Sequence, residues 1–489
     1  MGVIQKQGIQ NTIVTFIGIL IGFVNIIIIQ PRFLTPEEIG LTRMLFSFSS
    51  MVAVFLPLGI GNATVKFFPI YKDRAQKHHG YFGFMLIFPI VGFIITTSLL
   101  YIFREFFVSQ YIKESKLFTD FFNYVIPLSF IIGLLTVLNI YCNSLFKTTF
   151  PLLLNDVVTR IFIMIVISIY YLKWISIDEF VTFFVCVFAL QLLILIFYIL
   201  YIDKPSLRIN TKVLKTKSMT EIFNYAFLLS FAGIAATGLK LLDGIILGKF
   251  KPLFQVGIYS IVSFIPMIIE APLNSLEKIT NTKISDALAT KNMDSIKEIY
   301  FRSSRYLLLI GGLFFLGINV NINSLLTFLP PEFSSGGNVV LILSLGSLIN
   351  VAAGSNQSII FSSDSYKFGA FMLILLVIIA FGLNMFLIPI YGQEGAALST
   401  ALGALIYCLI RYVFILKTYK LQPFNVKTIA VLLLIAACFF LNKLLPTLDK
   451  PVLDILFHSA VIGGSYIIAV YFLKIVPEFH HFIPGHKKE

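Results

Sequence analysis

Residues 368–393, FGAFMLILLVIIAFGLNMFLIPIYGQ, contain no Asp, Glu, Lys or Arg. A helix needs about 20 mainly apolar residues to cross the hydrocarbon core of a bilayer, so this run is long enough for one complete span. Similar runs without these four residue types recur along the chain, at 7–31, 44–65, 81–103, 121–146, 180–202, 306–331 and 333–363. The pattern predicts a polytopic membrane protein.

The overall composition supports the same class. Of the 489 residues, 58% are hydrophobic and 12% are charged, whereas a soluble chain carries roughly 25% charged residues. The net charge of +13 is high enough for a nucleic-acid-binding protein. However, the basic residues lie between apolar runs, as membrane topology signals do, and not on a soluble domain. We therefore expect no nucleic-acid partner. The four cysteines lie inside apolar segments without paired spacing, so we also expect no metal site.

The remaining apolar segments contain internal charges or a shorter uncharged core. They lie at about 150–172, 222–249, 253–277, 395–416, 426–446 and 453–474. Together with the charge-free runs they predict an all-α protein of about fourteen transmembrane helices. With the N-terminus inside, the inner loops and tails contain 25 Lys and Arg residues and the outer loops contain 10. This asymmetry places both termini in the cytoplasm.

One of the two longest inner loops, the basic segment 203–221, separates the first twelve spans into two groups of six. We therefore predict a first half at 1–203, a cytoplasmic linker at 204–220, a second half at 221–420, and two additional helices with a tail at 421–489. A weak repeat supports the duplication: RFLTPEEIGL at 32–41 and GKFKPLFQVGIY at 248–259 occupy corresponding places. Residues 278–305 alternate charged and apolar side chains and predict a helix on the cytoplasmic membrane surface.

Two pairs of opposite charges lie inside predicted spans. Lys240 and Asp243 are three residues apart in TGLKLLDGIILG, 237–248, and Asp156 and Arg160 are four apart, so each pair can meet on one helical face. Two interpretations remain open. Each pair could neutralise itself within the membrane, or both could line a water-filled cavity in which Arg160 and Lys240 bind an anionic, phosphate-bearing substrate. Helix length places Lys240 in the outer half of its span and Arg160 nearer the midplane.

Other polar residues inside spans are further candidates. Glu270 has no opposite charge beside it in the sequence, so Glu270 and Asp156 are predicted to couple transport to protons or sodium. Amide side chains could either pack helices together or bind the hydroxyl groups of a sugar; they are Asn139, Asn143, Asn350 and Gln357. We find no HExxH, GxSxG, Walker or Rossmann pattern. The sequence thus predicts a transporter without a bound cofactor, and not an enzyme.

Several blocks resemble a known family. They are RFLTPEEIG at 32–40, LGIGNATVKFFP at 58–69, LLDGIILGKF at 241–250, VGIY at 256–259 and NMFLIPIYGQEGAALSTALGALI at 384–406. In order and position, across 7–420, they resemble the polysaccharide transporter (Wzx-type flippase) branch of the MOP superfamily. The resemblance implies two six-helix lobes in a V around a cationic central cavity, with ion-coupled alternating access. It places Asp243 at the family's acidic position in helix 7 and Arg32 at its basic residue before the outer turn.

The function implied by this resemblance is to flip an undecaprenyl-diphosphate-linked oligosaccharide across the bacterial inner membrane. The product would supply O-antigen, capsule or exopolysaccharide synthesis, with a polymerase and chain-length proteins as partners. Three alternatives stay open: a MATE-type drug or metabolite antiporter, a peptidoglycan-precursor flippase and a membrane polysaccharide polymerase. A polymerase would normally carry a large outer loop, whereas the outer loops here are short.

Overall fold

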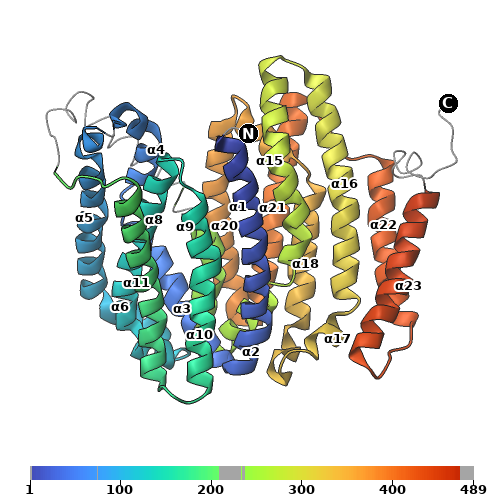
Figure 1. Cartoon of the computed structure of the whole chain (residues 1–489). Helices are drawn as coiled ribbons and strands as arrows, with labels where there is room; N and C mark the ends of the chain where they lie inside the picture. Colours follow the sequence, from blue (N-terminus) through green and yellow to red (C-terminus); the bar gives the residue numbers. More distant parts are fainter. Residues whose placement is uncertain (1–2, 74, 209–232, 234–236, 474–489) are drawn as a thin grey trace. The chain divides into compact units, whose positions relative to one another are not determined.

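The computed structural model describes residues 3–73, 75–208, 233 and 237–473, which form helices and turns without any strand (Figure 1). The chain divides into two compact units, Met1–Ser260 and Ile261–Glu489. Most of the predicted linker at 204–220 falls outside the described residues, so the predicted division at that place stays a prediction.

Among the described residues, eleven helices are long and apolar enough to cross a membrane, and a bent pair raises the number to twelve. The bent pair consists of α14, Leu253–Val262, and α15, Met267–Ala289, which meet at 52°. These helices coincide with twelve of the predicted spans, so the all-α polytopic class is confirmed. The number fourteen stays a prediction. The span predicted at 44–65 corresponds to two shorter helices, and much of 222–249 lies outside the described residues.

The first membrane helix of unit 1 contains a π-helical segment. It runs through α1 (Val3–Phe23), η1 (Val24–Ile29) and α2 (Gln30–Phe33). Thr35 and Glu38 form a capping box at the next turn: Glu38 N donates to Thr35 Oγ1 at 3.3 Å, and Thr35 N donates to Glu38 Oε2 at 2.8 Å. It starts α3, Pro36–Ala53. The chain then breaks at Leu58 and Gly59, both with positive φ, before α4, Ile60–Tyr71.

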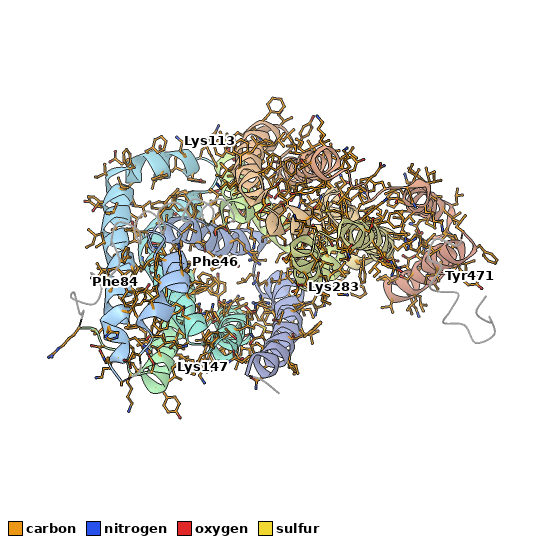
Figure 2. The ribbon with its side chains drawn as sticks, turned by 90° about the horizontal axis from the view of Figure 1, so that it is seen from above. Phe46, Phe84, Lys113, Lys147, Lys283 and Tyr471 are labelled. Carbon is orange, nitrogen blue, oxygen red and sulfur yellow. The ribbon has the colours of Figure 1, made fainter. Side chains whose placement is uncertain are left out.

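Seven further α-helices, a π-helical segment and several short turns complete the core of unit 1. They are α5 (Tyr81–Ile102), α6 (Arg104–Tyr111), α7 (Lys116–Asp120), α8 (Val125–Ser144), α9 (Thr149–Leu153) with η4 (Leu154–Val158) and α10 (Thr159–Tyr171), and α11 (Ile177–Ile202). Aromatic residues fill the space between them: Tyr141 packs edge-on against both Phe68 and Phe82. Figure 2, seen from above, labels Phe84 on α5 and Phe46 on α3, which both contribute to the hydrophobic core of this unit. Helix α14 continues the unit, and Gly40 of α3 lies so close to Leu253 that an added Cβ would be 2.2 Å from its carbonyl oxygen.

Unit 2 begins with the pair α15 and α16, Met293–Asn319. This pair corrects the predicted surface helix at 278–305, because those residues form the end of α15 and the start of α16. The reason is packing: Ile284, Ile296 and Tyr300 are buried in one hydrophobic cluster, which holds both segments upright against the bundle. Asn292 caps α16 by accepting a hydrogen bond from Ser295 N at 3.0 Å.

The rest of unit 2 packs around this pair. Its elements are α17 (Ile322–Leu326), η5 (Pro331–Gly336), α18 (Gly337–Ala352), α19 (Asn356–Ser362), α20 (Tyr366–Tyr391), α21 (Gln393–Tyr419), α22 (Val426–Leu441), η6 (Asn442–Leu444) and α23 (Pro451–Phe472). Helix α21 packs against both α18 and α20, whereas α22 and α23 pack on α16. Figure 2 labels Tyr471 on the latter pair. Gly354, at φ +60°, separates α18 from α19 within the span predicted at 333–363.

Candidate functional site

Arg160 lies at the contact between α10 and the first helix of unit 1. Its Nη1 donates a hydrogen bond to the Gly18 carbonyl oxygen at 2.7 Å. Gly22, one turn further along α1, leaves the space that the guanidinium fills, since an added Cβ would be 1.9 Å from Nη1. The side chain is partly buried. Two glycines of α1 therefore position a permanently charged group inside a membrane span.

A second arginine acts on the same region. Arg43 is two turns into α3, is partly buried, and interacts electrostatically with Arg160. The count of Lys and Arg in inner and outer loops assigns Arg43 to an outer loop. The structure corrects this assignment, because Arg43 lies within α3, which begins at Pro36. Close by in the sequence, Glu38 of α3 accepts a hydrogen bond of 2.5 Å from the Tyr170 hydroxyl of α10. Helices α3 and α10 thus both contribute charged side chains to unit 1.

Asp156 does not use Arg160 as a hydrogen-bond partner. Its Oδ1 accepts a hydrogen bond from Asn155 Nδ2 at 2.8 Å, and Gln191 of α11 donates to Asn155 Oδ1 at 3.3 Å. Asp156 lies in the π-helical segment η4, beside Gly18 of α1. Single π-helical turns inside α-helices are frequent at functional sites. The spacing of four residues indicates a self-neutralising pair, but Arg160 instead reaches across to α1.

The pair Lys240 and Asp243 also separates. The Tyr259 hydroxyl of α14 donates to Asp243 Oδ2 at 2.7 Å, whereas the side chain of Lys240 is exposed. The carboxylate therefore joins the helix at 237–250 to α14, and the lysine projects away from the packed interior of unit 1. Arg32, at the end of α2, is exposed as well.

Unit 2 contains a buried arginine that the sequence does not single out. Arg411 of α21 has 3% of its surface exposed. Its Nη1 donates to Gln357 Oε1 at 3.0 Å, its Nη2 donates to Cys408 Sγ at 3.3 Å, and its guanidinium lies 4.0 Å from the centre of the Tyr407 ring. Arg411 falls within the span predicted at about 395–416, although the count of basic residues assigns it to the inner loop that follows; its burial within α21 agrees with the span. We call these four residues the Arg411 cluster.

Two of the three carboxylates of α15 lie near the Arg411 cluster. Glu270 and Glu277 are both partly buried and two helical turns apart, and Arg411 and Glu270 both interact electrostatically with Glu277. Asn350 of α18 accepts a contact of 3.8 Å from Cys408 Sγ. The structure therefore brings three predicted residues, Glu270, Asn350 and Gln357, into one region of unit 2. Asn139 and Asn143, on α8 of unit 1, are partly buried and exposed.

The sequence does not single out Arg43 and Arg411 because both lie near the ends of apolar segments, where basic residues are also common as topology signals. Their position inside a helical pattern is the signal that could reveal them. Arg305 of α16 is a further arginine that lies inside a helix: it is 7% exposed, and its guanidinium carbon lies 5.1 Å from the centre of the Phe301 ring. Among the described residues, no cluster of three or more His, Cys, Asp or Glu could hold a metal ion.

Membrane transport proteins share this fold. A structure titled Lipid II flippase MurJ, in an inward closed conformation, matches with a TM-score of 0.72 and 16% identity, over 95% of this chain and 98% of the other. An inward-facing MATE family multidrug resistance transporter of the MOP superfamily matches at 0.57 with 12% identity, over 81% and 93%. A MOP superfamily transporter from Pyrococcus furiosus matches at 0.55 with 12% identity, over 84% and 94%. The chain thus shares its fold with these three transport proteins.

The family follows from the sequence match. The model of the family described as "Polysaccharide biosynthesis protein" matches residues 4–277, more than half of the chain. The chain belongs to this family, as the resemblance predicts. A full-length relative is an uncharacterized membrane protein of Methanocaldococcus jannaschii, 23% identical over 473 residues that cover 90% of this chain and 89% of the relative.

Proposed function

We propose that the protein flips an undecaprenyl-diphosphate-linked oligosaccharide across the bacterial inner membrane for surface polysaccharide synthesis. The observation that carries the proposal is the family match over residues 4–277, which includes every helix of unit 1 described above. Two permanently charged guanidinium groups support an anionic substrate: Arg160 lies inside a membrane span, and Arg43 lies on α3 of the same unit.

The chemistry of a diphosphate headgroup suits these side chains. Arginine stays charged at any physiological pH and binds phosphate oxygens through two parallel hydrogen bonds. Arg160 uses Nη1 for the Gly18 carbonyl, so its other donors are the ones that would bind phosphate. Arg43 adds a second positive charge. The two like charges repel each other, and a bound dianionic group would relieve that repulsion.

Ion coupling is the second part of the proposal. Glu270 and Asp156 are partly buried carboxylates on membrane helices of units 2 and 1 respectively. A carboxylate in such a position can exchange a proton or a sodium ion between two conformations. We propose that one of them couples flipping to the ion gradient. A polymerase and chain-length proteins would act on the flipped product.

The proposal is tested in proteoliposomes that contain the purified protein. The probe is the undecaprenyl-diphosphate-linked oligosaccharide isolated from the source cells and labelled on its glycan, and a membrane-impermeant lectin reports its arrival in the opposite leaflet. We expect protein-dependent flipping that saturates with substrate. Flipping no faster than in protein-free liposomes, with a correctly folded protein, would contradict the proposal.

A second candidate is flipping of a peptidoglycan lipid precursor. The observation that favours it is the structural match to the lipid II flippase, which covers 95% of this chain. Lipid II in the same proteoliposome assay separates the two functions. Faster transfer of lipid II than of the oligosaccharide carrier would make it the better description, and transport of small cationic drugs alone would favour a MATE-type antiporter.

A further inference from the structure

A cavity of about 270 Å³ opens at the surface of unit 2, where several helices end. Its walls come from the end of α16, from α17, from η5 with the start of α18, and from the last turn of α22. The cavity involves neither the Arg411 cluster nor the charged residues of unit 1. The basic-residue count places these helix ends on the outer side of the membrane.

The lining is polar yet uncharged. None of its nine residues is acidic or basic; three are amides, Asn319, Asn323 and Asn338, and two are hydroxyl-bearing, Ser334 and Ser335. One wall is the aromatic ring of Phe439. An anion would find no positive charge here. A metal cation would find no carboxylate, and the space is far larger than a single ion needs.

Two of the three amides are held by hydrogen bonds from their Nδ2 groups. Asn319 is 6% exposed, and its Nδ2 donates to the Phe315 carbonyl at 2.9 Å. The Nδ2 of Asn338, whose side chain is exposed, donates to Glu394 Oε1 at 2.8 Å. Together with the hydroxyls of Ser334 and Ser335, the amides give the cavity uncharged hydrogen-bonding groups. Such a lining suits a ligand that carries several hydroxyl groups.

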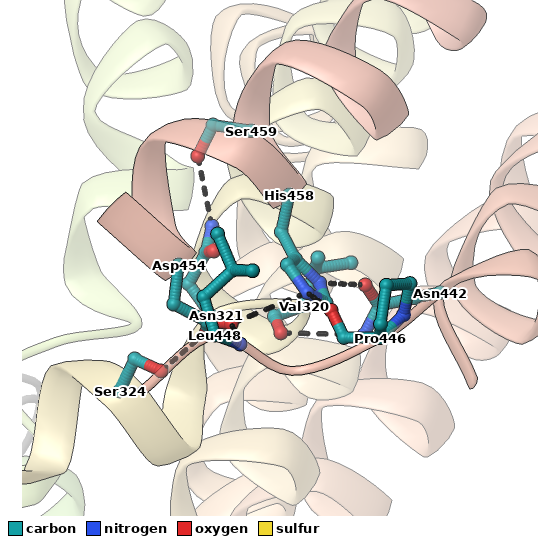
Figure 3. A network of polar contacts seen from close by, with 9 residues as sticks. All are labelled: Val320, Asn321, Ser324, Asn442, Pro446, Leu448, Asp454, His458 and Ser459. Atoms are coloured by element: carbon teal, nitrogen blue, oxygen red, sulfur yellow. Dashed lines mark hydrogen bonds and ion pairs between the residues drawn. The ribbon is translucent and has the colours of Figure 1, made fainter. Parts of the chain in front are cut away.

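The walls of the cavity are held in place. Phe439 packs against Phe315 of α16, with ring centroids 6.0 Å apart. Gln393 Nε2 donates to the Ser335 carbonyl at 3.2 Å and so fixes η5. Three residues after Phe439, Asn442 Nδ2 donates to the Val320 carbonyl at 3.3 Å and joins the segment after α22 to the end of α16 (Figure 3). A preformed site of this kind loses little entropy when a ligand binds.

We propose that this cavity binds one sugar ring of a glycan. Acceptor oxygens and hydroxyls on one side match sugar hydroxyls, the Phe439 ring offers an apolar surface for the C–H face, and the volume is just below the usual range for small-molecule pockets, as suits one ring. The sugar comes either from the lipid-linked substrate or from a free glycan in the outer compartment. That the sugar belongs to the lipid-linked substrate rests on the proposed function, whereas the binding of a sugar ring in this cavity does not.

Saturation-transfer NMR on the full-length protein in nanodiscs tests the site. The probes are the methyl glycosides of glucose, galactose, mannose, rhamnose and N-acetylglucosamine. We expect saturation transfer to at least one probe. The signal should fall by about tenfold in N323A/N338A, which removes two hydrogen-bonding amides, and in Phe439→Leu. Gln422→Ala, which removes an exposed amide outside the cavity, should leave it unchanged.

A second arm distinguishes the two sources of the sugar. The probe that binds is also presented as its short-chain prenyl diphosphate conjugate. Tighter binding of the conjugate, with the same proportional loss in N323A/N338A, identifies the lipid-linked substrate as the source, whereas equal binding identifies a free glycan. No transfer to any probe, or a signal that the cavity variants leave intact, overturns the proposal. Because no transport is measured, that result is separate from a failure to flip lipid.

Discussion

Gly22 of α1 leaves the space that the guanidinium of Arg160 occupies, because a Cβ at position 22 would lie 1.9 Å from Arg160 Nη1. The same nitrogen donates to the Gly18 carbonyl. The position of the arginine therefore depends on residues about 140 positions earlier in the chain. A substitution on α1 should displace this charge without removing it.

Replacing Gly22 by alanine should impair polysaccharide export nearly as strongly as removing Arg160. The added methyl group forces the guanidinium out of its place, since contacts below 3.0 Å between such atoms are not tolerated. Gly8→Ala on the same helix is the matched control, because nothing lies within 4 Å of a Cβ at that position. Cells that lack the native gene and carry each variant would be scored for surface polymer. Equal export by both variants would contradict this role of Gly22.

Arg160→Ala should reduce export by about tenfold or more, as expected when a charged hydrogen-bonding group worth roughly 1.5–3 kcal/mol is lost. Arg160→Lys should recover only part of the activity, because an ammonium group cannot form two parallel bonds to phosphate. Lys240→Ala should also impair export if the exposed lysine faces the substrate path. Membrane fractionation checks that each variant is inserted. Export at the wild-type level by both alanine variants would refute a cationic path.

Glu270→Gln should change the ion dependence of flipping. The variant keeps the shape of the side chain but cannot release a proton or bind sodium as a carboxylate does. Initial flipping rates in proteoliposomes, measured with imposed proton and sodium gradients, give the readout. Glu298→Gln is the control, because Glu298 is an exposed carboxylate that pairs with Arg302 at 2.7 Å. If both variants respond to the two gradients as the wild type does, the proposal that Glu270 couples flipping to an ion is contradicted.

Asp454→Asn should destabilise the packing of α23 on unit 2. Asp454 accepts hydrogen bonds from Leu448 N at 2.8 Å and from Ser324 Oγ at 2.6 Å, and lies 3.4 Å from His458 Nε2 (Figure 3). Losing part of this buried network costs roughly 1–3 kcal/mol. Thermal unfolding in detergent would show the decrease. The exposed Asp449→Asn should unfold at the wild-type temperature; an equal shift in both variants would argue against a specific network.

Most of the membrane helices were predictable because each depends on a local property of the chain. An apolar run of sufficient length crosses the bilayer largely independently of its neighbours, so seven of the eight charge-free runs and five of the six other predicted spans overlap membrane helices. The exception among the charge-free runs is 44–65, which is divided between α3 and α4. The turn at Thr35 was equally local: its capping box joins residues three apart. Local patterns misjudged residues 278–305, because the burial of Ile284 and Tyr300 against distant helices decides their direction.

The sequence by itself determined that this is an all-α membrane protein of the polysaccharide biosynthesis family, because hydropathy and ordered blocks of residues carry that information directly. Only the tertiary structure decided which charges meet. Spacing along one helix allows Arg160 to meet Asp156 and Lys240 to meet Asp243. In the structure, however, Arg160 donates a hydrogen bond to the Gly18 carbonyl, and Asp243 accepts one from the Tyr259 hydroxyl. The physical reason is that a side chain takes its partner from whichever helix packs beside it, and that neighbour is set by the fold.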